Sequence, residues 1–152
     1  MGTSAHLRLM RDLYRIEKDP PPGISAYPCD DSLLEWDALI AGPLGSAYEI
    51  GIFRLHLKFF QSYPKKLPMI QFKSKMFHPN IFSDGIVCIE TLPEGSDQTI
   101  DVATILIALQ TLLGDPFPDS PANHYAAYLY LHDREKYERM VKRCVELSLE
   151  KL

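Results

Sequence analysis

The hydrophobic pattern of the first segment has the period of a helix. Between Ser4 and Lys18, apolar residues return every three or four positions, at Leu9, Leu13 and Ile16, which predicts an amphipathic helix. Ser4 is a suitable N-terminal cap. The run Asp19-Pro20-Pro21-Pro22 ends the helix, because proline has no amide hydrogen and restricts the residue before it.

Four segments with the composition of strands follow this helix. They span Ile24 to Cys29, Leu34 to Ala41, Ile50 to Phe60 and Met69 to Lys73. The third is the clearest, because its β-prone apolar residues stand between polar ones. Turns rich in glycine and proline, such as Gly42-Pro43-Leu44-Gly45, separate the segments. Short connections between consecutive strands favour an antiparallel meander.

The last third of the chain predicts three more helices. Asp101 caps the first, which ends at Gly114, and its apolar residues form one broad stripe: Val102, Ile105, Leu106, Leu109, Leu112 and Leu113. The other two span Asn123 to Leu131 and Asp133 to about Leu149. The fold class is therefore α+β, with an N-terminal helix, a four-stranded antiparallel meander packed on a central helix, and C-terminal helices.

Length and charge narrow the class of protein. At 152 residues the chain fits a single domain, residues 1–152, with a substantial core. The formal net charge of -4 argues against direct nucleic-acid binding, which needs a basic surface. The sequence contains neither a signal peptide nor an apolar run that spans a bilayer, so we expect no membrane association and a cytoplasmic or nuclear location.

The cysteines suggest a reducing intracellular environment. Cys29, Cys88 and Cys144 are far apart and odd in number, and no CxxC pair is present, so we expect neither a disulfide framework nor a metal site. Cys144 falls on the apolar side of the last helix, which makes it a core residue. Trp36 is also expected in the core.

Cys88 is the candidate for chemistry. It follows a glycine turn, and His78 and Asn80 stand shortly before it. A thiolate is a strong nucleophile, so a loop cysteine beside polar groups is a candidate catalyst. Most single cysteines are small buried residues instead. The flanking residues favour the catalytic interpretation.

Those flanking residues resemble the signature of ubiquitin-conjugating enzymes. The signature here is His78-Pro79-Asn80, a turn ending at Gly85, and Ile86-Val87-Cys88-Ile89-Glu90. Other landmarks of the family recur in order over essentially the whole chain: Asp19-Pro20-Pro21, Trp36, Gly42-Pro43, Tyr63-Pro64 and Asp115-Pro116-Phe117-Pro118-Asp119. Segments such as Ser120-Pro121-Ala122-Asn123 are most similar to the DNA-repair and histone-modifying subfamily.

The resemblance implies an activity and its partners. Cys88 would accept ubiquitin from the activating enzyme as a thioester and pass it to a lysine or a ligase. The activating enzyme consumes the ATP, so no bound cofactor is expected. The alternative is a non-catalytic relative that binds ubiquitin or scaffolds a partner, and the presence of Cys88 with Asn80 favours the enzyme. A cysteine hydrolase has no local signature here.

The resemblance also implies roles around the cysteine. Asn80 either presents its amide to the oxyanion or holds the active-site loop, and both readings stay open. His78 is expected to form hydrogen bonds within the loop, and Pro79 to fix its turn. Ser120 and Asp119 would form the opposite wall and orient the incoming lysine, although Ser120 replaces an acidic residue common in the family.

Two surfaces are implied for partners. Arg8 and Arg11, on the polar side of the first helix, would dock the activating enzyme. Lys65, Ser96 and Gln98 would face a ligase. The family usually has a Trp-Ser-Pro-like segment where Ser96-Asp97-Gln98 stands here, and a second proline where Leu67 precedes Pro68. The chemistry is therefore expected to be retained, with an altered choice of ligase whose type the sequence leaves open.

Overall fold

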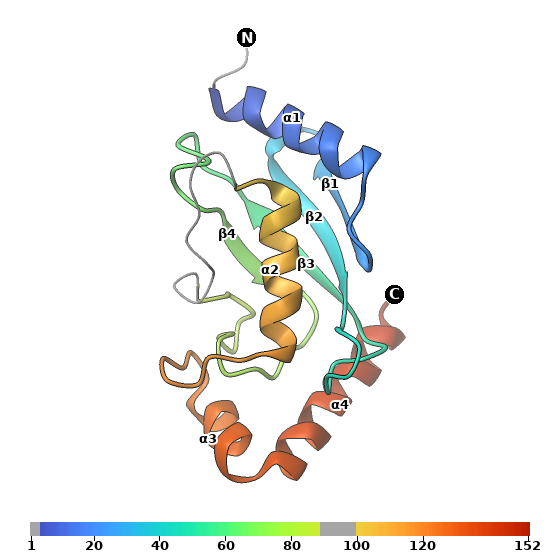
Figure 1. Cartoon of the computed structure of the whole chain (residues 1–152), viewed down its shortest axis with the longest axis vertical. Coiled ribbons are helices and arrows are strands. Elements are labelled where there is room, and N and C mark those ends of the chain that lie inside the picture. Colours follow the sequence, from blue (N-terminus) through green and yellow to red (C-terminus); the bar gives the residue numbers. More distant parts are fainter. Residues whose placement is uncertain (1–3, 89–99) are drawn as a thin grey trace.

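A computed structural model describes residues 4–88 and 100–152. Its elements run in the predicted order (Figure 1): α1 Ser4–Lys18, β1 Ile24–Cys29, β2 Ser32–Ala41, β3 Ile52–Lys58, β4 Met69–Phe72, α2 Val102–Gly114, α3 His124–His132 and α4 Arg134–Glu150. The four strands form one sheet in the order β1-β2-β3-β4, and each neighbouring pair is antiparallel. The predicted α+β meander is confirmed.

Most element boundaries agree with the sequence, and β3 is the largest exception. The prediction ran from Ile50 to Phe60, whereas β3 spans Ile52–Lys58. Ile50 has a φ of 67°, in the left-handed region, so it belongs to a turn. At the other end Phe59 is buried with the core although the strand has ended. The prediction continued to Phe60 because Phe59 and Phe60 are apolar, although the strand geometry ends at Lys58.

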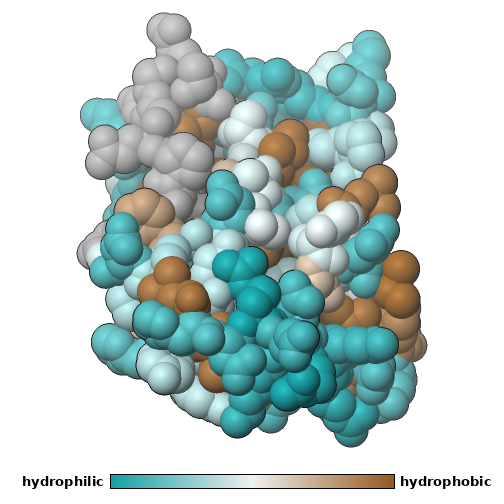
Figure 2. Space-filling model, turned by 60° about the horizontal axis from the view of Figure 1, so that its bottom comes forward, coloured by the Kyte–Doolittle hydropathy of each residue, from teal (hydrophilic) through white to brown (hydrophobic). Residues whose placement is uncertain are grey.

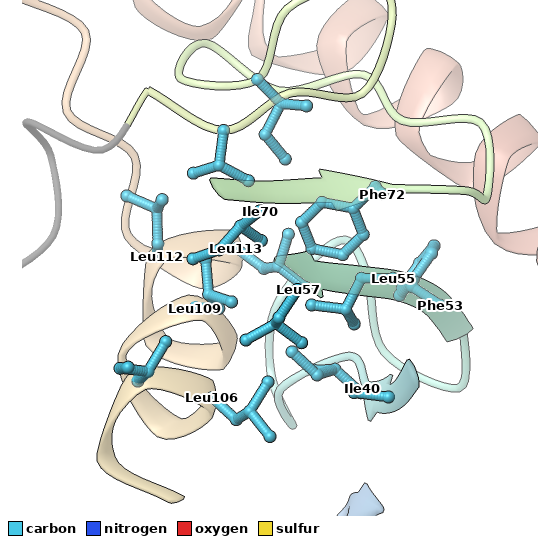
Figure 3. Close-up of a cluster of buried hydrophobic side chains, with 14 of the residues drawn as sticks. Ile40, Phe53, Leu55, Leu57, Ile70, Phe72, Leu106, Leu109, Leu112 and Leu113 are labelled. Carbon is cyan, nitrogen blue, oxygen red and sulfur yellow. The ribbon is translucent and has the colours of Figure 1, made fainter. Parts of the chain in front are cut away.

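Helix α2 lies across one face of the sheet (Figure 1). Its apolar stripe meets the inward side chains of β2, β3 and β4, as Figure 3 shows for Leu106, Leu109 and Leu113 facing Ile40, Leu57 and Ile70. Burial of such side chains is the main favourable contribution to folding. Trp36 and Cys144 both belong to this core, as predicted.

A buried polar network joins α1 to the rest of the molecule. Asp12 is fully buried and accepts a hydrogen bond from the hydroxyl of Tyr63. Burial raises the pKa of Asp12. Nε of Arg8 lies 3.5 Å from the Asp12 carboxylate, and the Arg8 guanidinium donates to the Ile100 carbonyl at 2.6 Å. The side chain of Arg8 is only 15% exposed, so the expected polar face does not include it.

The end of the molecule that carries α3 and α4 is mainly polar. Figure 2 turns this end forward and shows hydrophobic residues there in small, separate groups. Single exposed apolar residues are normal on a folded surface. Within residues 4–88 and 100–152, no helix is both long and apolar enough to cross a bilayer.

Candidate active site

The loop that leads to Cys88 is built on a glycine that no other residue can replace without strain. Gly85 has a φ of +92°, and a Cβ placed there would lie 2.1 Å from the carbonyl oxygen of Phe72. The close approach allows the Phe72 amide to donate to the Gly85 carbonyl at 2.8 Å. An isolated bridge between Ile81 and Val87 then returns the chain toward Asn80. The loop is thus anchored to the end of β4.

His78 uses both ring nitrogens to hold this loop. Its Nε2 donates to the Leu112 carbonyl at 2.7 Å, and its Nδ1 accepts from the Asn80 amide at 2.9 Å. This pattern requires a neutral imidazole with its proton on Nε2. Burial lowers the pKa of His78 to about 4, which favours the same state. His78 therefore has no ring nitrogen left to act as a base on Cys88.

Asn80 is fully buried, and its side chain pairs with the backbone of the opposite loop. Its Oδ1 accepts from the Phe117 amide at 2.8 Å, and its Nδ2 donates to the Phe117 carbonyl at 2.8 Å. A weaker contact of 3.5 Å joins Nδ2 to the Ser120 carbonyl. The amide is therefore engaged in holding the loop, one of the two readings that the sequence left open.

Cys88 is tied to the same residue through the backbone. Its amide donates to the carbonyl of Asn80 at 3.0 Å. Its side chain is partly exposed, unlike that of Cys144, which is buried in the core. Cys29 lies at the end of β1. Among the three cysteines, only Cys88 combines partial exposure with a loop held by buried polar groups.

The opposite loop is held at two further points. The amides of Ala122 and Asn123 both donate to the carbonyl of Pro79, at 2.7 and 3.0 Å. Asp119 and Ser120 lie between these contacts and the Asn80–Phe117 pair, and both side chains are exposed. The structure therefore brings the loop of Asp119 and Ser120 against the loop that ends at Cys88, with two exposed polar side chains beside it.

Two buried tyrosines, Tyr48 and Tyr137, also support the loop, and no pattern in the sequence indicated their role. The hydroxyl of Tyr48 donates to the Phe77 carbonyl and lies 3.0 Å from the hydroxyl of Tyr137 on α4. Burial raises the pKa of Tyr137 to about 12 and that of Tyr48 as well, so both remain protonated donors. Tyr48 is 29 residues from Phe77 and 89 residues from Tyr137 along the chain, so no local pattern predicts these contacts.

The structure describes three of the residues expected to contact partners: Arg8, Arg11 and Lys65. Arg11 is exposed on α1 and lines a shallow groove with Leu7, Tyr63 and Pro64, next to the exposed Lys65. Arg8 also lines this groove but is mostly covered by its contacts with Asp12 and Ile100. Ser96 and Gln98 lie outside the described residues.

Comparison with known proteins gives a consistent result. Residues 8–145 match the family described as ubiquitin-conjugating enzyme. The chain is 46% identical over 148 residues to ubiquitin-conjugating enzyme E2 1 of Caenorhabditis elegans, covering 97% of this chain and 77% of that protein. It is 47% identical over 148 residues to ubiquitin-conjugating enzyme E2 2 of Yarrowia lipolytica, covering 97% and 98%. For the E2 2 of Saccharomyces cerevisiae the identity is 46% over 150 residues, covering 99% and 87%.

Proposed function

Because the chain belongs to the ubiquitin-conjugating enzyme family, we propose that Cys88 is the residue on which it carries ubiquitin. Membership of the family implies ubiquitin, an activating enzyme and ligases as partners. The observation that carries the proposal is the position of Cys88: a partly exposed thiol whose amide is bonded to Asn80, on a loop fixed by buried His78. Cys144 is buried, and Cys29 lies at the end of β1.

The first step is a transthiolation. The thiolate of Cys88 attacks the carbonyl carbon of the ubiquitin thioester on the activating enzyme. A new carbon–sulfur bond forms, the old one breaks, and the thiolate of the activating enzyme leaves. The thiol proton goes to solvent, which the partial exposure of Cys88 allows.

The second step passes ubiquitin to an amine. A lysine nitrogen attacks the thioester carbonyl, an amide bond forms, and Cys88 leaves as a thiolate. The lysine must lose a proton, and Asp119 and Ser120 are the proposed residues that orient it. Their exposure on a loop fixed at Pro79 and Asn80 supports this role. A ligase with its own cysteine would accept ubiquitin by thiol exchange instead.

Asn80 acts in this scheme as a positioning residue. Its two hydrogen bonds to Phe117 set the distance between the walls of the site. For it to reach an oxyanion, its Nδ2 would have to leave a buried carbonyl, which costs about 1–3 kcal/mol when that partner is left unsatisfied. His78 and Pro79 hold the same loop, through Leu112 and the amides of Ala122 and Asn123.

The described parts of the two proposed partner surfaces lie next to each other. Arg11 and, to a smaller extent, Arg8 would meet the activating enzyme, and Lys65 with Ser96 and Gln98 would meet a ligase. Arg11 lines the same groove as Tyr63 and Pro64, which immediately precede Lys65. Two large partners at one groove would exclude each other. We therefore expect an activating enzyme and a ligase to compete for this protein.

Several further expectations complete the proposal. Residues 1–152 form one catalytic domain that needs no bound cofactor, because ATP is consumed by the activating enzyme. The protein acts in the cytoplasm or nucleus and binds neither nucleic acid nor membranes directly. The residues shared with the DNA-repair and histone-modifying subfamily support a role in those pathways.

A charging reaction tests the function. The protein is incubated with an activating enzyme, ubiquitin and ATP, and analysed on a non-reducing gel. We expect an adduct larger by one ubiquitin that a thiol reductant removes. Cys88→Ala should abolish it, whereas Cys29→Ser, which also removes one thiol, should retain it. Absence of the adduct from the folded wild-type protein would instead favour a non-catalytic ubiquitin-binding relative.

A further inference from the structure

A cluster of metal-ligand side chains lies on the sheet face opposite α2. Cys29 comes from β1, Asp37 and Glu35 from β2, and His56 from β3. Side chains alternate between the two faces of a strand. Leu55 and Leu57 point toward α2 in Figure 3, so His56 between them points the other way. All four side chains are partly or fully exposed to solvent.

Strand pairing brings these residues together although they are far apart in sequence. Asp37 and His56 are direct partners in the β2–β3 register. The β1–β2 register shifts between Pro28 and Cys29, where the regular pairing is interrupted. A bulge of this kind redirects a side chain, and the sulfur of Cys29 comes within 3.5 Å of the Asp37 carboxylate. This long-range origin explains why no local pattern in the sequence indicated the cluster.

The distances match a single cation site. Nδ1 of His56 lies 2.9 Å from Oδ1 of Asp37, and one ligand atom from each of Cys29, Asp37 and His56 lies within 4.8 Å of the others. On its far side, Nε2 of His56 lies 3.1 Å from Glu35. When the ring proton sits on Nε2 and faces Glu35, Nδ1 presents a lone pair to another acceptor. Two acceptors at that distance require a proton or a metal cation between them.

We propose that Cys29, Asp37 and His56 bind a Zn²⁺ ion, and that Glu35 orients the His56 ring. Thiolate, imidazole and carboxylate are the three ligand types that Zn²⁺ accepts in proteins. A carboxylate on the far nitrogen of the ring is the usual support for a zinc-bound histidine. The fourth position is open to water.

The ligand atoms need side-chain rotations to bind the ion, because Cys29 and His56 meet different oxygens of Asp37. Tetrahedral Zn²⁺ with a Zn–S distance of about 2.3 Å and a Zn–O distance of about 2.0 Å holds sulfur and oxygen about 3.5 Å apart. The sulfur of Cys29 lies 3.5 Å from Oδ2 of Asp37. The corresponding separation of nitrogen and oxygen is about 3.3 Å, and Nδ1 of His56 lies 2.9 Å from Oδ1 of Asp37. The carboxylate of Asp37 is exposed, so it can rotate to place one oxygen between the other two ligands.

The charges around the cluster also favour a cation. Asp37, Glu35 and Asp31 place negative charge around the sulfur of Cys29, and this charge attracts a cation. The thiol would lose its proton to solvent as the zinc–sulfur bond forms. The ion would then join β1, β2 and β3 on the face opposite α2.

Cobalt titration tests the site directly. The reduced full-length protein, freed of metal with a chelator, is titrated with Co²⁺, which takes the same ligands and absorbs in the near ultraviolet when a thiolate binds it. We expect one equivalent to produce this band and one equivalent of Zn²⁺ to remove it. Zn²⁺ should also raise the melting temperature, because it binds the folded protein preferentially.

Variants assign the ligands. Cys29→Ser and His56→Gln should both abolish the band, and His56→Gln keeps all three thiols. Cys88→Ser removes one thiol elsewhere and should leave the band intact. Glu35→Ala should weaken Zn²⁺ binding by about 10–100-fold, as expected for a residue that only orients a ligand. Circular dichroism verifies that each variant is folded.

The contrary results are equally clear. A folded wild-type protein that gives no thiolate band and no rise in melting temperature would overturn the proposal. So would a band that survives Cys29→Ser or disappears with Cys88→Ser. The four side chains would then form a hydrogen-bonded cluster that binds no metal.

Discussion

At the scale of single residues, the loop beside Cys88 depends on polar side chains with fixed protonation and fixed partners. His78 must be neutral to accept from Asn80 and donate to Leu112. Asn80 must present a donor and an acceptor to Phe117 in the same plane. Neither residue is free to react, so the proposed chemistry falls to Cys88 and the residues on the opposite loop.

The first prediction concerns the pH dependence of stability. The folded pKa of His78 is lowered to about 4, whereas an unfolded histidine has a pKa near 6.5. Between these values the unfolded state binds the additional proton, so stability contributed by His78 is lost as the pH falls from about 6.5 to about 4. The full loss is about 3 kcal/mol. Urea unfolding at several pH values measures the unfolding free energy at each pH. Between about pH 6.5 and about pH 4 this free energy should fall more steeply with decreasing pH in the wild type than in His78→Gln. An equal pH dependence in the two proteins would contradict this account.

The second prediction separates the two readings of Asn80. Asn80→Ala removes both hydrogen bonds to buried Phe117 groups and should destabilise the protein by about 2–4 kcal/mol. It should slow charging of Cys88 and transfer to lysine alike, because both need the two loops in place. Asn80→Asp keeps the acceptor for the Phe117 amide but sets a buried carboxylate oxygen against the Phe117 carbonyl, so it should also destabilise the protein. Unchanged stability, with only the transfer to lysine slowed, would instead support direct contact with the oxyanion.

At the scale of elements, the sequence predicted what depends on local pattern. The bounds of α1 and β1 agree with the structure. The three later helices begin after N-terminal caps whose side chains accept hydrogen bonds from first-turn amides: Asp101, Asn123 and Asp133. Contacts between residues far apart in the sequence were not predicted. Phe117 is 37 residues from Asn80, and Arg8 turned inward because its guanidinium reaches the Ile100 carbonyl 92 residues away. No local pattern encodes such contacts.

The third prediction concerns the turn before Cys88. Gly85→Ala should destabilise the protein by about 2 kcal/mol or more, because it combines left-handed backbone with a clash against the Phe72 carbonyl. Gly45→Ala is the matched control: Gly45 has a φ of +81°, but an added Cβ meets nothing within 4 Å. Its cost should be only about 1–2 kcal/mol. Denaturant unfolding compares them, and a Gly85→Ala cost no larger than that of Gly45→Ala would show that the turn tolerates the side chain.

At the scale of the whole molecule, α1 has two separate tasks. Its inner side joins the domain through Asp12, Tyr63 and Arg8, and Arg15 adds an ion pair of 2.9 Å with Asp101 at the start of α2. Its outer side carries exposed Arg11 beside the groove at Tyr63 and Pro64. Arg11 thus belongs to the proposed docking surface alone, whereas Arg8 is part of the buried network and also lines the groove.

The fourth prediction follows from this division. Arg11→Glu should slow charging by the activating enzyme and leave the unfolding free energy almost unchanged, since exposed substitutions usually change it by less than about 0.5 kcal/mol. Arg8→Ala should lower stability as well, because it leaves the buried carboxylate of Asp12 without its cation. Arg139→Glu makes the same charge change on the exposed side of α4 and should affect neither quantity. Equal charging rates in Arg11→Glu and Arg139→Glu would exclude Arg11 from docking.

One measurement tests the central claim most directly. The protein charged with ubiquitin is digested without reduction, and mass spectrometry identifies the residue that carries the C-terminal remnant of ubiquitin. This account predicts the remnant on the peptide that contains Cys88, and none on the peptides of Cys29 and Cys144. A remnant on Cys29, or a protein that never acquires a thioester, would contradict it.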